Sequence, residues 1–376
     1  MRGEMNSGLY IHVPFCRSKC AYCDFYSVTQ TEKIPPFIES LIREMELYRG
    51  LFGRFDTIYL GGGTPSLLNI GQIEAILDAI YGTFTVTDTA EITIETNPGD
   101  LTPDMAAALR AAGINRINIG VQSFDDGVLA LLGRRHSAAQ AIDAIENART
   151  AGFANVGFDL IYGIPGQNLE SWLETLKMAL SLTPEHLSCY QLTLEPSTPL
   201  GREYRNGTIV PPDDDLLCDL FTRTSETLEE AGYLHYEISN FARGEEWVSR
   251  HNRKYWDHTP YLGLGPAAHS FSAPRRWWNH RSLEKYVEAA GRGIPPIGGT
   301  ELLNRGQLCL EALYLGLRTR EGIDLAAFAE RYGYDLLGER GDLLSTMERE
   351  GLITVTGGHL RPTRSGLAIS DSLPLL

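Results

Sequence analysis

Short apolar runs alternate with amphipathic segments through the first two thirds of the chain. The runs are rich in β-branched and aromatic residues, which favours strands, and lie at Leu9–Phe15, Thr57–Leu60, Glu91–Glu95, Arg116–Val121, Val156–Tyr162 and Leu187–Leu194. Between them, apolar positions recur at helical spacing over Pro36–Leu51, Ile70–Tyr81, Pro103–Ala112, Ala138–Ala151 and Leu169–Leu182. Repeated strand–helix units predict an α/β fold with a parallel sheet, and leave a doubly wound sheet and a partial barrel as alternatives.

The last third of the chain has a different pattern. A helix is predicted over Asp213–Ala231, and residues 233–300 after it are rich in aromatic residues and histidine. Helices are then predicted at Arg305–Leu317, Leu325–Tyr332 and Leu336–Glu350, followed by a hairpin with a Gly-Gly turn. We therefore expect a barrel-like region 1–232, a connecting region 233–300 and a small, mainly helical, winged-helix-like domain 301–376.

Three cysteines stand close together after the first predicted strand. Cys16, Cys20 and Cys23 have the spacing C-x3-C-x2-C. Three thiolates can hold three corners of a cubane iron–sulfur cluster, and because most clusters use four cysteines, such a set leaves one iron open to a small molecule. A zinc site with His12 as fourth ligand is an alternative, although zinc sites usually use C-x2-C pairs. A disulfide is disfavoured, because three clustered cysteines cannot all pair.

The residues around the cysteines resemble a known family. The run from Tyr10 to Cys23 resembles the signature of the radical S-adenosylmethionine (SAM) superfamily, and Pro14-Phe15 and Tyr22 resemble the branch with oxygen-independent coproporphyrinogen dehydrogenases and heme chaperones of the HemW type. The resemblance implies a partial (β/α)6 barrel, a [4Fe-4S] cluster on the three cysteines, and SAM chelated to the open iron. Reductive cleavage of SAM then gives a deoxyadenosyl radical, while the protein supplies binding and orientation.

The resemblance also implies a set of SAM-contacting residues at the carboxyl ends of the strands, where parallel barrels carry their sites. They are Tyr10, Tyr22, Gly62, Gly63, Thr64, Glu95, Gln122, Arg134 and Asp159. Glycine lets a ligand approach the backbone, and a guanidinium can bind a carboxylate bidentately; Arg135 is the alternative arginine in register. The structural alternatives are a tight turn for the glycines and ion pairs with arginine for Glu95 and Asp159, because an unpaired buried charge is unfavourable.

Two departures distinguish the chain from the dehydrogenases. The dehydrogenases carry a further cysteine two residues after the triple, whereas Cys23 is followed here by Asp24-Phe25. They also carry a long N-terminal arm, whereas fifteen residues precede Cys16 in this sequence. Both departures match the heme chaperones. We expect a protein that binds heme and passes it to heme-accepting proteins. The alternative is an enzyme that oxidises coproporphyrinogen. Because this choice leaves catalytic turnover open, no catalytic residue is assigned.

A second motif lies at residues 251–256 and has the H-N-x-x-Y-W pattern of the chaperones. His251 is the candidate axial ligand of heme, with His269 as a second candidate and Arg253 or Lys254 as partners of the propionates. The structural alternative is that Tyr255 and Trp256 are core aromatics and that His251 is hydrogen-bonded within the protein.

Composition narrows the class of protein. The net charge of −15 disfavours nucleic-acid binding, and no apolar run has the length of a membrane span. We expect Cys189, Cys218 and Cys309 to be buried as small hydrophobic residues, and retained free cysteines favour a cytoplasmic location. A peripheral membrane association, a homodimer and a separate electron donor for the cluster are further expectations. A zinc-bound adaptor that uses its C-terminal module for protein contacts is the third hypothesis.

Overall fold

The core of the molecule is a large sheet whose central strands follow one another in chain order. The structure, a computed structural model, describes residues 6–375, so the outermost residues of the predicted regions 1–232 and 301–376 lie outside it. The sheet has the strand order β12-β11-β10-β9-β1-β2-β3-β4-β5-β6-β8-β7. Its parallel centre consists of β1 (Ser7–Val13), β2 (Arg54–Gly62), β3 (Thr85–Thr96), β4 (Arg116–Gln122), β5 (Val156–Tyr162) and β6 (His186–Gln191).

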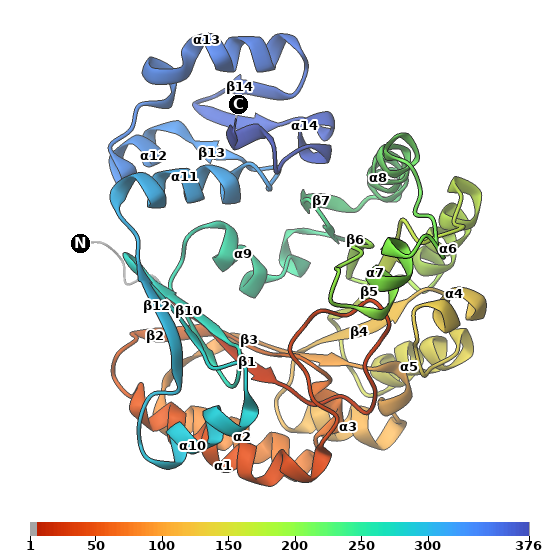
Figure 1. Cartoon of the computed structure of the whole chain (residues 1–376), viewed down its shortest axis with the longest axis vertical. Helices are drawn as coiled ribbons and strands as arrows, with labels where there is room; N and C mark the ends of the chain where they lie inside the picture. Colours follow the sequence, from red (N-terminus) through yellow and green to blue (C-terminus); the bar gives the residue numbers. More distant parts are fainter. Residues whose placement is uncertain (1–5, 376) are drawn as a thin grey trace.

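This strand order decides between the two predicted architectures. A doubly wound sheet reverses its strand order at a switch point and carries helices on both faces. Here β1 to β6 are neighbours in sequence order, and Figure 1 shows the helices between them on the outer side of a curved sheet. The predicted partial (β/α)6 barrel is confirmed.

The predicted helices of the barrel are present, with ends shifted by a few residues. They are α1 (Ile34–Leu47), α2 (Ile70–Thr83), α3 (Pro103–Ala111), α5 (Ala138–Thr150), α6 (Leu169–Ser181) and α8 (Asp214–Glu230). Capping boxes begin three of them, at Asn69, Ser137 and Asn168. The prediction missed α4 (Asp126–Leu131) and α7 (Pro199–Arg205), because so short a helix shows hardly two turns of periodicity.

Residues 233–300, predicted as a connecting region, supply both flanks of the sheet. β7 (Leu234–Glu237) and β8 (Asn240–Ala242) extend it beyond β6. On the other flank β9 pairs in parallel with β1, and β10 to β12 continue as antiparallel strands. The elements of this flank are β9 (Tyr261–Leu264), β10 (His269–Ser272), β11 (Arg275–Asn279), α10 (Leu283–Gly291) and β12 (Ile297–Leu302), and α9 (Arg250–Trp256) precedes them. The boundaries at 232 and 300 stay a prediction.

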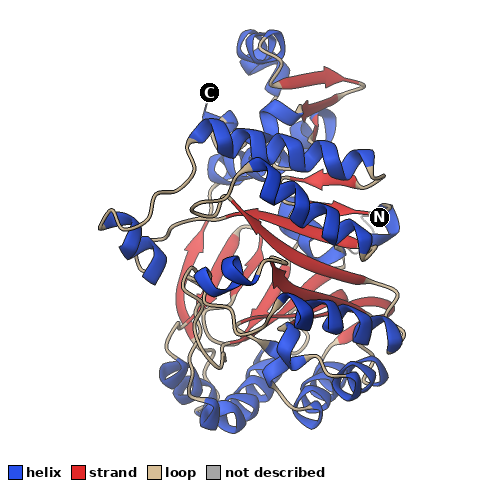
Figure 2. Ribbon diagram, turned by 90° about the vertical axis from the view of Figure 1, so that its right-hand side faces the viewer, coloured by secondary structure: helices blue, strands red, loops and turns tan. Residues whose placement is uncertain are grey.

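The C-terminal residues form a small unit of helices and short strands at the top of Figure 2. This unit has a hydrophobic core of its own. Its helices are α11 (Arg305–Gly316), α12 (Leu325–Tyr332), α13 (Leu336–Arg349) and α14 (Arg364–Ala368), and its sheet consists of β13 (Ile323–Asp324), β15 (His359–Pro362) and β14 (Ile353–Thr356). Gly357 and Gly358 have φ of +59° and +78° in the hairpin turn between β14 and β15. The predicted hairpin is therefore present, and glycine is favoured at its turn because both positions need positive φ.

Burial of the isolated cysteines was predicted with mixed success. Cys189 on β6 is buried, and Cys309 on α11 is half-buried in the C-terminal core. The prediction was wrong for Cys218, which is exposed, because α8 turns that side toward solvent and packs its other side on the barrel. Within residues 6–375, no helix combines the length and the apolar composition that a membrane span needs.

Candidate functional site

The three clustered cysteines lie in a loop at the carboxyl end of β1. The loop is held at its base, because the Cys16 N–H donates to the Val28 carbonyl at 2.9 Å and the Val28 N–H donates to the Pro14 carbonyl at 2.6 Å. Cys16, Cys20 and Cys23 are free and half-buried. All three line a cavity of about 540 Å³, which we call the cysteine cavity. Neighbouring loops from the carboxyl ends of β2 to β6 complete its wall.

The end of β2 lies directly against the cysteine loop. The Gly63 N–H donates to the Val13 carbonyl at 2.8 Å, and the Thr64 hydroxyl donates to the Cys16 sulfur at 3.4 Å. Gly62 has a φ of +106°, and a Cβ there would lie 2.6 Å from the His12 ring. Glycine is thus needed at position 62 for the positive φ and for the close approach of the His12 ring, which fits the tight-turn alternative. Gly62, Gly63 and Thr64 also line the cysteine cavity, as the resemblance implied.

Two half-buried carboxyl groups face the cysteine cavity from β3 and β5. Glu95 accepts hydrogen bonds from the Tyr59 hydroxyl at 2.8 Å and the Gly62 N–H at 3.2 Å, and Asp159 accepts one from the Asn118 amide at 2.9 Å. Within the described residues neither carboxyl forms the ion pair with arginine that the structural alternative requires. Burial and the neighbouring Asp159 raise the pKa of Glu95 to about 7, and burial raises the pKa of Asp159. Two desolvated carboxyls favour a cationic ligand.

Arg134 and Arg135 both line the cysteine cavity, but their contacts differ. The Arg134 guanidinium donates to the Cys20 sulfur at 3.4 Å and to the Gly120 carbonyl at 2.7 Å, and its Nε is buried with no partner in the described chain. Arg135 instead forms an ion pair with the buried Asp100 side chain at 3.6 Å. A guanidinium beside a cysteine sulfur stabilises negative charge on that sulfur, so Arg134 suits a cluster site.

Gln122 and Tyr22 line the cysteine cavity as well, whereas Tyr10 does not. The pairing of β4 with β5 shifts register just before Gln122, whose φ is +69°; such a conformation is uncommon away from glycine and occurs often at functional sites. Tyr10 points instead into a neighbouring cavity, where its hydroxyl is 3.1 Å from His12 Nδ1. Tyr10 therefore lines the adjoining cavity, and its contact with SAM stays a prediction.

A zinc site with His12 finds no support in the geometry. Both ring nitrogens of His12 are hydrogen-bonded, to the Tyr10 hydroxyl and, at 2.8 Å, to the Tyr26 carbonyl. Within residues 6–375, no three His, Cys, Asp or Glu side chains converge on a single-ion site. A cubane cluster holds its corner irons apart, so its thiolates need not converge. The donor set of three free cysteines around one cavity, with Arg134 and two half-buried carboxyls, fits a cluster with SAM beside it.

Sequence reasoning missed two supporting residues of this site. Tyr59, on β2, and Asn118, on β4, hold the two half-buried carboxyls by hydrogen bonds. A polar residue inside an otherwise apolar strand was the available signal, and it could have identified Asn118 in particular.

Comparison with known proteins agrees with this geometry. Residues 10–179 match the model of the radical SAM superfamily, and residues 303–369 match the HemN C-terminal domain. The heme chaperone HemW of Mycobacterium tuberculosis is 36% identical over 97% of this chain and 93% of its own length. HemW of Lactococcus lactis is 33% identical over 97% and 95%, respectively. The chain belongs to the HemW family of radical SAM proteins.

A solved structure agrees with the same family. Coproporphyrinogen III oxidase (HemN) from Escherichia coli superimposes with a TM-score of 0.86 at 26% identity, covering 99% of this chain and 90% of that chain. A mitochondrial protein of Mus musculus, radical S-adenosyl methionine domain-containing protein 1, is 35% identical over 98% of this chain and 86% of its own. The cofactors of the superfamily are a [4Fe-4S] cluster and SAM, and the residues of the cysteine cavity fit both.

His251, the predicted heme ligand of the H-N-x-x-Y-W motif, is enclosed within the protein. Its Nδ1 is 2.9 Å from the Thr57 hydroxyl and its Nε2 is 2.9 Å from the Tyr255 hydroxyl. Its ring also stacks on Tyr59 with the centroids 5.1 Å apart. Burial, with Lys254 nearby, lowers the pKa of His251 to about 3. An axial ligand needs a free ring nitrogen, so the structure favours the hydrogen-bonded alternative for His251.

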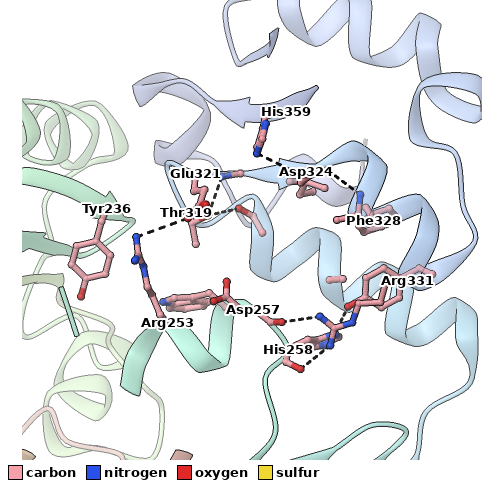
Figure 3. A pocket seen from close by; sticks show the side chains of 17 residues that line it. Tyr236, Arg253, Asp257, His258, Thr319, Glu321, Asp324, Phe328, Arg331 and His359 are labelled. Atoms are coloured by element: carbon pink, nitrogen blue, oxygen red, sulfur yellow. Dashed lines mark hydrogen bonds and ion pairs between the residues drawn. The ribbon is translucent and has the colours of Figure 1, made fainter. Parts of the chain in front are cut away.

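The basic residues of the same motif are also engaged. The Lys254 ammonium lies 2.7 Å from Asp56 and donates to the Asn6 carbonyl at 2.8 Å. Arg253 pairs with Glu245 at 3.3 Å, and it lines a polar cavity of about 390 Å³ between α9 and the C-terminal unit (Figure 3). Both side chains thus pair with carboxylates of the protein, and their contact with a propionate stays a prediction.

Helix α9 joins the barrel to the C-terminal unit. On the far side of the cavity in Figure 3, the Arg331 guanidinium donates to the carbonyls of Asp257 and His258 at 3.0 and 2.9 Å. His258 Nδ1 lies 2.9 Å from the Tyr332 hydroxyl. The residues that make these contacts come directly after the H-N-x-x-Y-W motif in the chain. The helix that carries the motif therefore has a structural role, because it connects the barrel to the C-terminal unit.

Proposed function

We propose that this protein is a heme chaperone, which binds a [4Fe-4S] cluster, SAM and heme and passes heme to heme-accepting proteins. The observation that carries the proposal is the near full-length similarity to proteins named heme chaperone HemW in several bacteria. The residues after the cysteine triple support it, because Phe25 occupies the position of the additional cysteine expected of the dehydrogenases and is 71% exposed.

Different residues of the cysteine cavity would hold the cluster and SAM. When bound and reduced, the cluster supplies the electron that cleaves SAM. Cys16, Cys20 and Cys23 would hold the cluster, and the Arg134 guanidinium would favour negative charge on the Cys20 side. The carboxyls of Glu95 and Asp159 would bind the cationic part of SAM, with Glu95 oriented by Tyr59.

The second candidate function is oxidation of coproporphyrinogen, and the fold favours it. The structure superimposes on the E. coli enzyme over almost the whole chain. Because both functions use the same cysteine cavity, the cavity does not distinguish a chaperone from an oxidase. A turnover assay distinguishes them, since only an oxidase releases an oxidised and decarboxylated porphyrinogen.

The test combines two anaerobic assays on reconstituted protein. We expect heme to bind in a one-to-one titration and to move to an apo-form heme acceptor such as an apo-cytochrome. We expect no decarboxylated product from coproporphyrinogen in the presence of SAM and dithionite. Product formation at a rate well above that of a Cys16→Ala variant would contradict the chaperone proposal. The electron donor, the homodimer, the cytoplasmic location and the peripheral membrane association stay predictions.

A further inference from the structure

A second cavity of about 650 Å³ adjoins the cysteine cavity, and we call it the aromatic cavity. Asp24 and Phe25, which follow the last clustered cysteine, line both cavities. Its other walls come from β1 and from the flank of the sheet that β9 to β11 add beside β1. The volume is in the range of cavities that hold cofactors.

Flat aromatic rings form the walls of this cavity. His269 on β10 and Trp278 on β11 are direct cross-strand partners, and their rings stack with centroids 5.7 Å apart at an angle of 26°. Tyr255 and Tyr261 meet edge to face with centroids 4.7 Å apart. Gly299 makes room for the Trp278 indole, since a Cβ there would lie 2.3 Å from the ring. Such walls suit a flat, apolar macrocycle.

His269 differs from His251 in having free ring nitrogens. It is exposed at the cavity, and no described residue makes a hydrogen bond or ion pair with its imidazole. Partial burial and the nearby Arg276 and Arg281 lower the pKa of His269, so the ring is neutral at physiological pH. A neutral imidazole with an accessible lone pair is the form that binds iron.

A cation stands at the same cavity. Arg281 is exposed, lines the aromatic cavity and pairs with no carboxylate among residues 6–375. A guanidinium in this state can bind a carboxylate in a bidentate manner. Aromatic walls, a free imidazole and a free guanidinium are together the groups that recognise an iron porphyrin with propionate side chains.

We propose that heme binds in the aromatic cavity, with His269 as an axial ligand and Arg281 as a partner of a propionate. The inference rests on the proposed chaperone function and moves the heme site from the H-N-x-x-Y-W helix to the β10–β11 hairpin. His251 then serves the site indirectly, because it positions Tyr255, a wall of the aromatic cavity, through a hydrogen bond.

The axial ligand is tested by heme spectra of the full-length protein. In His269→Gly we expect the ferric absorption and electron paramagnetic resonance signals of the histidine ligand to disappear, and added imidazole to restore them. His280→Ala is the matched control, since His280 lines the same cavity and also lacks a hydrogen bond in the described chain. An unchanged spectrum in His269→Gly, or loss of the signals in His280→Ala alone, would overturn the assignment.

The propionate contact is tested by affinity. We expect Arg281→Gln to weaken heme binding about tenfold, as loss of a charge-assisted hydrogen bond does, and to leave the affinity for heme dimethyl ester unchanged. Equal effects on both ligands would refute the pairing. If the wild-type protein binds no heme at all, the proposed function fails; if it binds heme while both variants behave like the wild type, only this location of the site fails.

Discussion

The cysteine cavity and the aromatic cavity are neighbours but are built in different ways. The cysteine cavity takes its wall from loops that follow β1 to β6, at the common carboxyl edge of a parallel sheet. The aromatic cavity joins the β1 loop to strands from far along the chain, which reach it because β9 pairs with β1. A site of the first kind follows from repeated strand–helix units and motifs, whereas one of the second kind depends on strand pairing at the sheet flank.

The two cavities also differ in their electrostatics. Glu95 and Asp159 bring half-buried carboxyls to the cysteine cavity, and burial raises the pKa of both groups. The aromatic cavity offers stacked rings and a free guanidinium. The first therefore suits a cation such as SAM, and the second suits a flat ligand with carboxylates. Substitutions in the cysteine cavity should leave heme binding unchanged, and substitutions in the aromatic cavity should leave SAM binding unchanged.

The largest expected effect is loss of the cluster in Cys16→Ala. Removal of one of three thiolates leaves too few ligands to hold a cubane, so the iron and sulfide content and the visible absorption of the cluster should fall to background after anaerobic reconstitution. Cys218→Ala, at an exposed cysteine outside both cavities, is the control and should reconstitute fully. Full cluster content in Cys16→Ala would contradict the ligand assignment. Heme binding by the variant should persist.

The next effect concerns Glu95→Gln, which should weaken SAM binding by roughly 10- to 100-fold through loss of a buried charge pair. The ionised carboxylate attracts the cation, and the pKa of Glu95 is raised to about 7. Wild-type affinity should therefore fall as the pH drops through about 7, where Glu95 takes up a proton, and the variant should lack this dependence. Calorimetric titration with SAM between pH 6 and 8 measures both.

A matched control for Glu95 exists elsewhere in the barrel. Glu44 on α1 is fully buried, and burial raises its pKa to about 7 as well. It accepts hydrogen bonds from Tyr286 and Asn279, both at 2.6 Å, and is outside the cysteine cavity. Glu44→Gln should keep the pH dependence of SAM binding. If it abolishes that dependence as Glu95→Gln does, the effect arises from stability and not from the site.

A smaller effect separates the two adjacent arginines. Arg134→Lys should weaken SAM binding about tenfold, because a lysine lacks the planar fork that reaches both the Cys20 sulfur and the Gly120 carbonyl. Arg135→Lys should stay within about twofold of the wild type, because lysine keeps the positive charge that pairs with Asp100. Equilibrium dialysis with reconstituted protein distinguishes them. The reverse order of effects would shift the register of the site by one residue.

The smallest effect is expected for Tyr59→Phe. The variant removes one hydrogen bond to Glu95, so SAM affinity should fall about fivefold, and the midpoint of its pH dependence should move upward because the ionised carboxylate loses a donor. Tyr204→Phe, at an exposed tyrosine, serves as control. A midpoint that moves down would mean that Tyr59 does not hold Glu95 by its hydroxyl.

Prediction from the sequence was most accurate where local pattern and topology coincide. The strands β1 to β6 and the long helices between them were found, because each has a clear period and an end signal. The short α4 was missed, and β3 begins earlier than predicted, at Thr85. The strands β9 to β12 were not predicted, since short edge strands of mixed aromatic and polar residues show no clean alternation. As a result, residues 233–300 were expected to connect two domains, whereas they complete the main sheet.

The site residues, too, were predicted where local sequence patterns place them and missed where only the fold does. Glu95, Gln122 and Asp159 line one cavity with the cysteines. Arg134 and Arg135 line it too, but only Arg134 contacts a cysteine sulfur within the described residues. Tyr10 lies in the other cavity, because side chains alternate between the two faces along a strand and no spacing in the sequence shows which face borders which cavity.

The sequence by itself determined the cysteine spacing, the succession of strand–helix units and the polar residues at the strand ends, because these are local features that a parallel sheet gathers at one edge. Only the tertiary structure decided which histidine has a free imidazole. The sequence motif favoured His251 over His269. In the structure, hydrogen bonds to Thr57 and Tyr255 occupy the ring of His251, whereas the pairing of β10 with β11 leaves His269 open to a cavity. Such partners come from distant segments, so their effect on a ligand atom exists only after the chain has folded.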